Sequence, residues 1–267
     1  MSIFELAADE ASAYESDGFV IRENVFSSAE IARLGEAAER AVALAARLGR
    51  QGKTYTLDGN RFVDADHLTI QYEHGPASET IRVIEPVHEL DAELDALIDD
   101  PRIVEPMCGL VECEQVSLWT GKLNLKRPRE GSGFRWHQDS PYWIHDSSHV
   151  DRLPNVLITL DDATEANGCM RIIRGSHTNG CLPGIGDGSQ LEGFFTDPAC
   201  FDETQQVPLV VAAGSLVFFH PHSVHGSQPN ASDVARRALI LTYQPAGFPM
   251  LKSGELRNAV TPNGGVS

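Results

Sequence analysis

The residues best suited to chemistry lie in the segment Arg135-Trp136-His137-Gln138-Asp139. His137 and Asp139 are two residues apart, so on an extended segment their side chains point to the same side. An imidazole and a carboxylate suit a ferrous ion, and with a second imidazole they fill three positions on one face of it. Three positions then stay open, as in non-haem Fe(II) oxygenases. An isolated His-x-Asp tripeptide is more often structural, so this hypothesis needs support from the rest of the chain.

Three downstream histidines are candidates for the third ligand: His220, His222 and His225. His220 ends an apolar segment and can equally be a strand-end histidine that faces the core or the solvent. His222 lies in an expected turn. His225 is followed eleven residues later by Arg236 at the start of an apolar strand. This spacing favours His225, since a ligand at the end of one strand and an anion receptor on the next can share a pocket.

Arg236 and Arg237 are adjacent on that expected strand, so one points inward and the other toward water. A guanidinium offers two parallel donors that match a carboxylate, which a lysine does not. The offset from His225 favours Arg236 as the inward residue. The alternative is that both arginines are solvated surface charges.

Alternating residues of segment 118–126 place Thr120, Lys122, Asn124 and Lys126 on one face. A polar face just before the metal motif is either exposed to solvent or lines a cofactor cavity. In the second case we expect Lys122 and Asn124 to donate hydrogen bonds to a ligand carboxylate.

These residues need a scaffold that brings distant segments together. Helices are expected at 5–15, from Ser27 or Ser28 to about 48, and at 87–98, with a strand at 18–22 and a less regular segment after residue 48. Short strands separated by turns are expected at 116–126, 155–161, 169–173, 207–211, 215–220 and 236–244. The pattern predicts a mainly β protein, a double-sheet jelly roll with a helical annex. We expect one domain over 1–267, with a mostly helical N-terminal layer (1–110), a jelly-roll core (111–245) and a C-terminal extension (246–267). Residues 178–207 are expected to form a flexible lid.

Composition restricts the partners. The chain has 267 residues and a formal net charge of -17, with 21 Lys and Arg against 38 Asp and Glu, which argues against nucleic-acid and anionic-membrane partners. The longest apolar run, 207–219, is interrupted by Pro208 and Gly214 and is too short to span a membrane. Five cysteines without a CxxC pair indicate scattered reduced thiols. With no signal-peptide pattern at the N-terminus, these features predict a soluble cytoplasmic protein that acts on a small molecule.

Several motifs in order resemble the phytanoyl-CoA dioxygenase-like family of Fe(II)/2-oxoglutarate oxygenases. They are Asp17-Gly18-Phe19-Val20, Lys126-Arg127-Pro128, Trp136-His137-Gln138-Asp139, the segment 160–169 (LDDATEANGC), Gly175-Ser176-His177, Ala213-Gly214-Ser215-Leu216, and His225-Gly226-Ser227 with Arg236. The resemblance covers most of the chain. It departs at Arg174, where the family usually has proline, and at Leu157, where some members have tryptophan.

The resemblance implies a cupin-like double-stranded β-helix and a role for each matched residue. It implies that His137, Asp139 and His225 bind the iron and that Arg236, assisted by Ser227, binds the distal carboxylate of 2-oxoglutarate. Lys122 falls at a position similar to a cosubstrate contact in relatives. Trp143 is similar to an aromatic residue that contacts substrate in one branch of the family, and Tyr142 is a second aromatic candidate for the pocket wall.

The implied cofactors are Fe(II), 2-oxoglutarate and O2, and the implied reaction is hydroxylation of an unactivated C–H bond with release of succinate and CO2. A halogenase is disfavoured, because a halide would need the position that Asp139 fills. Desaturation, epimerisation and cyclisation stay open, as does a non-catalytic jelly roll that binds a ligand. Succinate formation that depends on Fe(II) and 2-oxoglutarate would separate the enzyme from the binding module.

Overall fold

The computed structural model describes residues 3–75 and 77–261. Its α-helices are α1 (Ala8–Asp17), α2 (Ser28–Gly49), α3 (Ala92–Ala96) and α4 (Pro101–Val111). The strands are β1 (Phe19–Arg22), β2 (Lys53–Leu57), β3 (Asn60–Ala65), β4 (Leu68–Tyr72), β5 (Ile81–Glu85), β6 (Val116–Lys126), β7 (Phe134–His137), β8 (Asn155–Thr159), β9 (Met170–Ile173), β10 (Gln206–Pro208), β11 (Leu216–Phe219), β12 (His225–Ser227) and β13 (Arg236–Pro245). Short 3-10 helices are η1 (His88–Leu90), η2 (Leu97–Asp99), η3 (Ser140–Tyr142), η4 (Val150–Arg152), η5 (Ser176–Asn179), η6 (Pro198–Cys200) and η7 (Glu203–Gln205).

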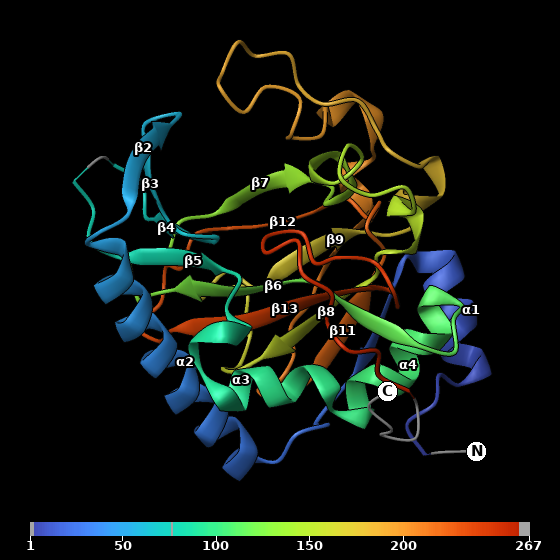
Figure 1. Ribbon diagram of the computed structural model, residues 1–267. Coiled ribbons are helices and arrows are strands. Elements are labelled where there is room, and N and C mark those ends of the chain that lie inside the picture. Colours follow the sequence, from blue (N-terminus) through green and yellow to red (C-terminus); the bar gives the residue numbers. More distant parts are fainter. Residues whose placement is uncertain (1–2, 76, 262–267) are drawn as a thin grey trace.

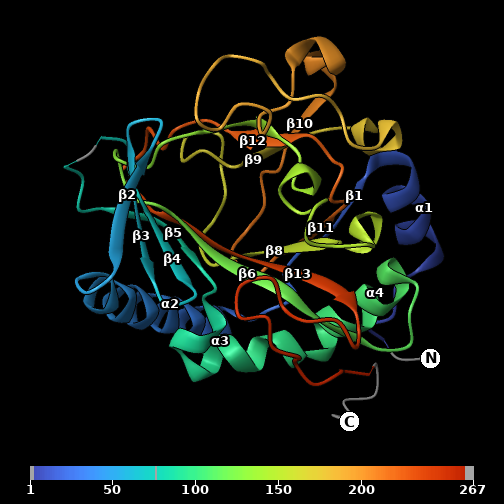
Figure 2. The ribbon, with the colours of Figure 1, turned by 45° about the horizontal axis from the view of Figure 1, so that its top comes forward.

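The strands form two antiparallel sheets, and the prediction of a jelly-roll core is confirmed. Over the described residues, the larger sheet has the order β1-β11-β8-β13-β6-β5-β4-β3-β2, and the smaller has the order β10-β9-β12-β7. The smaller sheet lies above the β8, β11 and β13 part of the larger one (Figure 2). An apolar cluster fills part of the space between them, and it includes Leu157, Met170, Ile172, Phe219 and Ala238.

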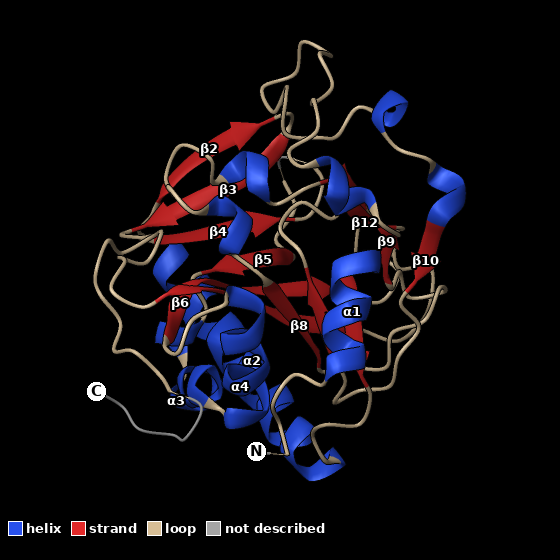
Figure 3. Ribbon diagram, turned by 90° about the vertical axis from the view of Figure 1, so that its right-hand side faces the viewer, coloured by secondary structure: helices blue, strands red, loops and turns tan. Residues whose placement is uncertain are grey.

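Helices α2, α3 and α4 cover the opposite face of the larger sheet (Figure 1, Figure 3). Ser27 caps α2 by accepting a hydrogen bond from the Glu30 backbone N–H, while the Glu30 carboxylate accepts from the Ser27 N–H. Ile31, Leu34 and the alanines that follow at helical spacing are buried against the sheet. Because these helices pack on the opposite face of the larger sheet, they do not occupy the space between the two sheets.

The segment after α2 differs from the expectation, because it is regular. Strands β2 to β5 extend the larger sheet by a four-stranded meander within the described part of the chain. Asp58 and Gly59 both have positive φ (48° and 78°) in the turn between β2 and β3, and Asp66 (58°) is in the turn before β4. Asp-Gly between two alternating runs is a strong hairpin signal that our sequence interpretation missed.

Helix α4 was also missed. The helical pattern expected at 87–98 is a single turn of α3 between 3-10 turns, and the longer helix begins only afterwards. Asp100 caps α4 through the Arg102 backbone N–H, and Pro101 occupies its first turn. Asp100-Pro101 therefore starts a helix that lies after the expected one at 87–98.

The C-terminal extension runs back along the larger sheet as far as residue 261. Leu251 donates its backbone N–H to the Trp119 carbonyl, and Val260 pairs with Val116. Residues 262–267 of the predicted extension lie outside the described residues. No helix among those described is long and apolar enough to cross a membrane. The five cysteines, all within the described residues, are free thiols.

Candidate metal centre

His137 and His225 lie directly opposite each other on the neighbouring antiparallel strands β7 and β12. Opposed residues of an antiparallel pair project from the same face, so the two imidazoles meet, with ring centroids 4.2 Å apart. Gly226 permits this approach, since a Cβ there would lie 3.0 Å from the Phe134 carbonyl oxygen and 3.2 Å from the Trp136 ring. The His-Gly-Ser sequence thus has a steric reason.

Asp139 reaches the two histidines in a different way from the one expected. Strand β7 ends at His137, and the Asp139 backbone is helical (φ -78°, ψ -31°), so the prediction that both ligands share an extended segment is wrong. A residue far along the chain holds this turn, because the N–H groups of Asp139 and Ser140 both donate to the Pro221 carbonyl at 3.1 Å. It brings the Asp139 carboxylate to 3.9 Å from His225 Nε2.

One possible ligand atom from each of His137, Asp139 and His225 lies within 4.8 Å of the other two. Among residues 3–75 and 77–261, this is the one group of three that could hold a metal ion. His137 Nδ1 lies 2.8 Å from the Arg135 carbonyl oxygen, and His225 Nδ1 lies 2.9 Å from the Ser223 carbonyl oxygen. A carbonyl only accepts, so both Nδ1 atoms carry the proton and both Nε2 lone pairs are free for a metal.

The electrostatics keep the cluster in the form that binds metal. Burial, with His225 nearby, lowers the pKa of His137 to about 3, so its imidazole is neutral. Burial alone would raise the pKa of Asp139, but His225 and Lys122 outweigh it and the pKa is lowered. The site therefore offers two imidazole Nε2 atoms and one carboxylate oxygen, a donor set that fits Fe(II).

His222 and His220, the other candidates for the third ligand, have different partners. The ring nitrogens of His222 lie 2.7 Å from Ser140 Oγ and 2.6 Å from Asp151 Oδ1. The ring of His220 packs near Tyr14 and accepts the His222 N–H at its Nδ1. Neither is part of the cluster formed by His137, Asp139 and His225.

Asn155, which the sequence interpretation missed, holds the carboxylate of Asp139 in place. Its Nδ2 donates to Asp139 Oδ2 at 3.0 Å, and its Oδ1 accepts from the Thr242 hydroxyl at 2.6 Å. Its signal was a polar residue immediately before the apolar run 156–158 of the strand. We expect Asn155→Leu to weaken Fe(II) affinity by about 10–100-fold, the usual cost of losing a partner of a metal ligand. Anaerobic Fe(II) titration measures this, and Asn155→Asp, which keeps an acceptor for Thr242, should restore little of it. Unchanged affinity in Asn155→Leu would contradict the role.

The polar face of β6 points into the space between the two sheets. Lys126 lies opposite Arg236, Asn124 opposite Ala238 and Lys122 opposite Ile240. Ala238 is part of the apolar cluster between the sheets and Ile240 packs against it, so these residues share that interior face. This face is therefore directed inward, with Lys126 buried and Lys122 and Asn124 half-buried, rather than fully exposed to solvent.

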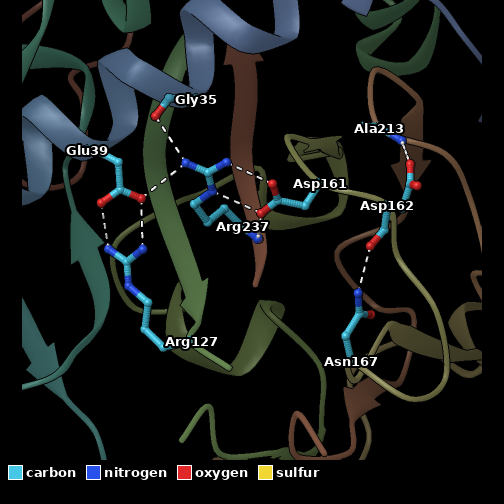
Figure 4. A network of polar contacts seen from close by, with 8 residues as sticks. All are labelled: Gly35, Glu39, Arg127, Asp161, Asp162, Asn167, Ala213 and Arg237. Atoms are coloured by element: carbon cyan, nitrogen blue, oxygen red, sulfur yellow. Dashed lines mark hydrogen bonds and ion pairs between the residues drawn. The ribbon is translucent and has the colours of Figure 1, made fainter. Parts of the chain in front are cut away.

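Arg236 and Arg237 have opposite surroundings. Arg236 is 4% exposed, its Nη2 donates to the Gly168 carbonyl at 2.8 Å, and its buried Nε has no partner among the described residues. Arg237 instead pairs with Asp161 at 2.7 Å and with Glu39 of α2 at 3.1 Å (Figure 4). Arg237 thus connects β13 to α2, while Arg236 keeps a free donor inside.

The two predicted substrate aromatics differ in position. The Tyr142 ring is perpendicular to His137 at 6.3 Å and stacks on Phe194 at 4.6 Å. Trp143 is buried (2% exposed) among Trp119 and other apolar side chains, and Lys122 Nζ lies 5.3 Å from its ring. Ser227 lies on β12, two residues from His225, opposite Phe134 and Met170.

Loop 178–207 passes over this end of the barrel and supplies Phe194, which the sequence interpretation did not single out. Its Thr196 N–H donates to the Trp136 carbonyl at 3.0 Å. Its tip contacts the β2–β3 turn, where the Asp58 carboxylate accepts the backbone N–H groups of Gln190 at 2.7 Å and Leu191 at 3.1 Å.

The contact between Asp58 and the loop tip predicts a measurable effect on mobility. We expect Asp58→Ala to increase amide hydrogen exchange at 188–193 by about 5-fold or more, since hydrogen bonds to charged groups contribute roughly 1.5–3 kcal/mol. Exchange in β6 should not change. Asp66→Ala, in the neighbouring turn, is the matched control. Equal exchange in both variants would show that Asp58 does not hold the loop.

Residues 14–238 match the family model of phytanoyl-CoA dioxygenase (PhyH). The chain is 28% identical to the ectoine dioxygenase of Bordetella parapertussis, over 89% of this chain and 75% of that protein. It is 28% identical to the L-proline trans-4-hydroxylase of Streptomyces griseoviridis, over 62% of this chain and 68% of that one. The crystal structure of EctD from S. alaskensis with bound Fe superposes with a TM-score of 0.71 at 25% identity, covering 94% of this chain and 82% of that one.

Proposed function

Because the chain belongs to the phytanoyl-CoA dioxygenase family, we propose that it hydroxylates an unactivated C–H bond of a small-molecule metabolite and releases succinate and CO2. The chain is a non-haem iron enzyme that uses 2-oxoglutarate and O2. One observation carries the proposal: three metal-ligating atoms converge within 4.8 Å on the interior where Arg236 is buried. We also propose that the whole chain, 1–267, acts as one catalytic domain.

We propose His137, Asp139 and His225 as the Fe(II) ligands. Nδ1 of each imidazole is held by a backbone carbonyl, and the carboxylate is held by Asn155. The three side chains are thus oriented before metal binds, so little ordering cost remains. Bound iron, together with 2-oxoglutarate, supplies the O2 activation that no side chain here provides.

We propose that Arg236 binds the far carboxylate of 2-oxoglutarate. Its partnerless buried Nε fits a ligand that brings its own acceptor. Ser227, Asn124 and Lys122 are the proposed additional contacts. Lys122 lies nearest the metal end, since it and His225 lower the pKa of Asp139.

Tyr142 and Trp143 stay our candidates for the substrate wall, with Tyr142 as the direct contact because its ring meets His137. Phe194 covers Tyr142 and would exclude water from that side. The relatives named for ectoine and L-proline support a small polar substrate.

A panel of small metabolites, with succinate release as the readout, tests the proposal. Release should require Fe(II), 2-oxoglutarate, O2 and the substrate. Mass spectrometry should show a product with one added oxygen atom; loss of two hydrogens or an unchanged mass would assign desaturation, cyclisation or epimerisation instead. If the protein binds both cofactors and no substrate stimulates turnover, the non-catalytic module is the better description.

A further inference from the structure

Lys126 and Arg236 form an unusual pair inside the barrel. They lie directly opposite each other on β6 and β13, and their exposures are 0% and 4%. Like charges opposed on neighbouring strands repel, and burial increases the cost because water no longer screens them. Within the described chain neither forms an ion pair with a carboxylate at 4.0 Å or less.

The heads of both side chains meet at Gly168. Arg236 Nη2 donates to the Gly168 carbonyl at 2.8 Å. A Cβ at position 168 would lie 2.8 Å from Lys126 Nζ and 2.3 Å from the Gln228 carbonyl oxygen, to which Lys126 donates. Because Gly168 has no side chain, the Lys126 ammonium fits beside the Arg236 guanidinium, and both groups face the same small space.

The other charged groups around Lys126 add positive charge. The Arg82 guanidinium of β5 lies 3.9 Å from the centre of the Phe134 ring, and Lys126 Nζ lies 5.7 Å from the same centre. Glu73, which follows β4, is buried and faces them with one carboxylate. Among the described residues near Lys126, the neighbouring groups are thus two guanidinium groups, this single carboxylate and the Cys169 thiol.

We propose that Lys126 is a second cation for the far carboxylate of 2-oxoglutarate, which it binds together with Arg236. This inference rests on the proposed function. A carboxylate has two oxygens and about four acceptor sites, so it accepts from a guanidinium and an ammonium at once. The ligand supplies the negative charge that the barrel lacks at this point.

Proton uptake should accompany this binding. Burial, then Arg236 and Arg82, lower the pKa of Lys126 to about 6, so at about pH 7.5 its amine is largely neutral without ligand. A carboxylate beside it favours the charged form and raises that pKa. Binding therefore takes up a proton, and affinity for 2-oxoglutarate should fall as pH rises from about 6 to 8. Burial lowers the pKa of Arg236 only to about 10 and raises the pKa of the Cys169 thiol, so neither group changes its charge over this range.

Isothermal titration of 2-oxoglutarate into the Mn(II)-loaded protein, in buffers of different ionisation enthalpy, tests the inference. We expect Lys126→Met to weaken binding by about 10-fold or more and to remove the proton uptake. Binding of 2-oxovalerate, which lacks the far carboxylate, should not change. Lys53→Met, at an exposed position of β2, is the control and should match the wild type.

The outcomes separate this inference from the proposed function. If the wild type does not bind 2-oxoglutarate, the proposed function is wrong. If the wild type binds it and Lys126→Met binds equally well with the same proton uptake, Lys126 is not a ligand contact. A merely structural lysine would instead lower the melting temperature of the unliganded protein when replaced and would leave both the affinity for 2-oxoglutarate and the proton uptake unchanged. Lys126→Gln provides the same comparison if the methionine variant does not fold.

Discussion

Replacement of His225 by alanine is expected to abolish iron binding and succinate formation. The variant loses one of the three proposed ligand atoms, which lie within 4.8 Å of each other. Loss of an outer partner of a metal ligand costs about 10–100-fold, so loss of a ligand should reduce turnover by more than about 100-fold. Anaerobic Fe(II) titration and succinate release under saturating 2-oxoglutarate measure the two effects.

Two other histidines serve as controls for His225. His145→Ala changes an exposed loop histidine and should bind Fe(II) like the wild type. His222→Gln tests the rejected ligand candidate, whose ring nitrogens are engaged by Ser140 and Asp151. Iron binding that survives in His225→Ala and disappears in His222→Gln would mean that the ligand set is misassigned.

Arg236→Met is expected to raise the KM for 2-oxoglutarate by about 10–100-fold, since hydrogen bonds between charged groups contribute roughly 1.5–3 kcal/mol. The free energy of unfolding should not fall, because the guanidinium is buried without a carboxylate partner in the described residues. Steady-state kinetics against 2-oxoglutarate and chemical denaturation measure the two quantities. Arg236→Lys should recover only part of the loss, because an ammonium lacks the two parallel donors.

The neighbouring Arg237 provides the matched control. Its guanidinium pairs with Asp161 and Glu39 on the far side of β13 (Figure 4). Arg237→Met should therefore lower the free energy of unfolding by about 1–2 kcal/mol with an unchanged KM. If Arg237→Met raised the KM and Arg236→Met lowered only stability, the inward and outward assignments would be reversed.

Local patterns predicted those parts of the fold that neighbouring residues determine. The expected strand 116–126, with alternation over 118–126, matches the bounds of β6, and Ser27 or Ser28 was expected to cap the helix that the structure starts after Ser27. The meander β2 to β5 was missed although the Asp58-Gly59 turn was readable, because its outer strands β2 and β3 bury few side chains and so resemble an irregular surface segment. Its pairing with β6 depends on contacts far apart in the sequence.

The candidate site, like the fold, could be predicted from local sequence patterns only in part. Residue types and spacing selected His137, Asp139 and Arg236, but the resemblance to a family supplied much of the preference for His225. The helical turn at Asp139 depends on the Pro221 carbonyl, which lies far along the chain. Asn155 and Lys126 were visible as polar residues of expected strands, but their partners lie on other parts of the chain, so no local pattern revealed those contacts.

The most direct test is a crystal structure of the protein with Mn(II) and 2-oxoglutarate, with the metal located by its anomalous scattering. We predict one metal peak bonded to His137 Nε2, His225 Nε2 and an Asp139 carboxylate oxygen, with the far carboxylate of 2-oxoglutarate on Arg236. A metal bound elsewhere, for example between His220 and His222, or a cosubstrate that does not contact Arg236, would contradict the account.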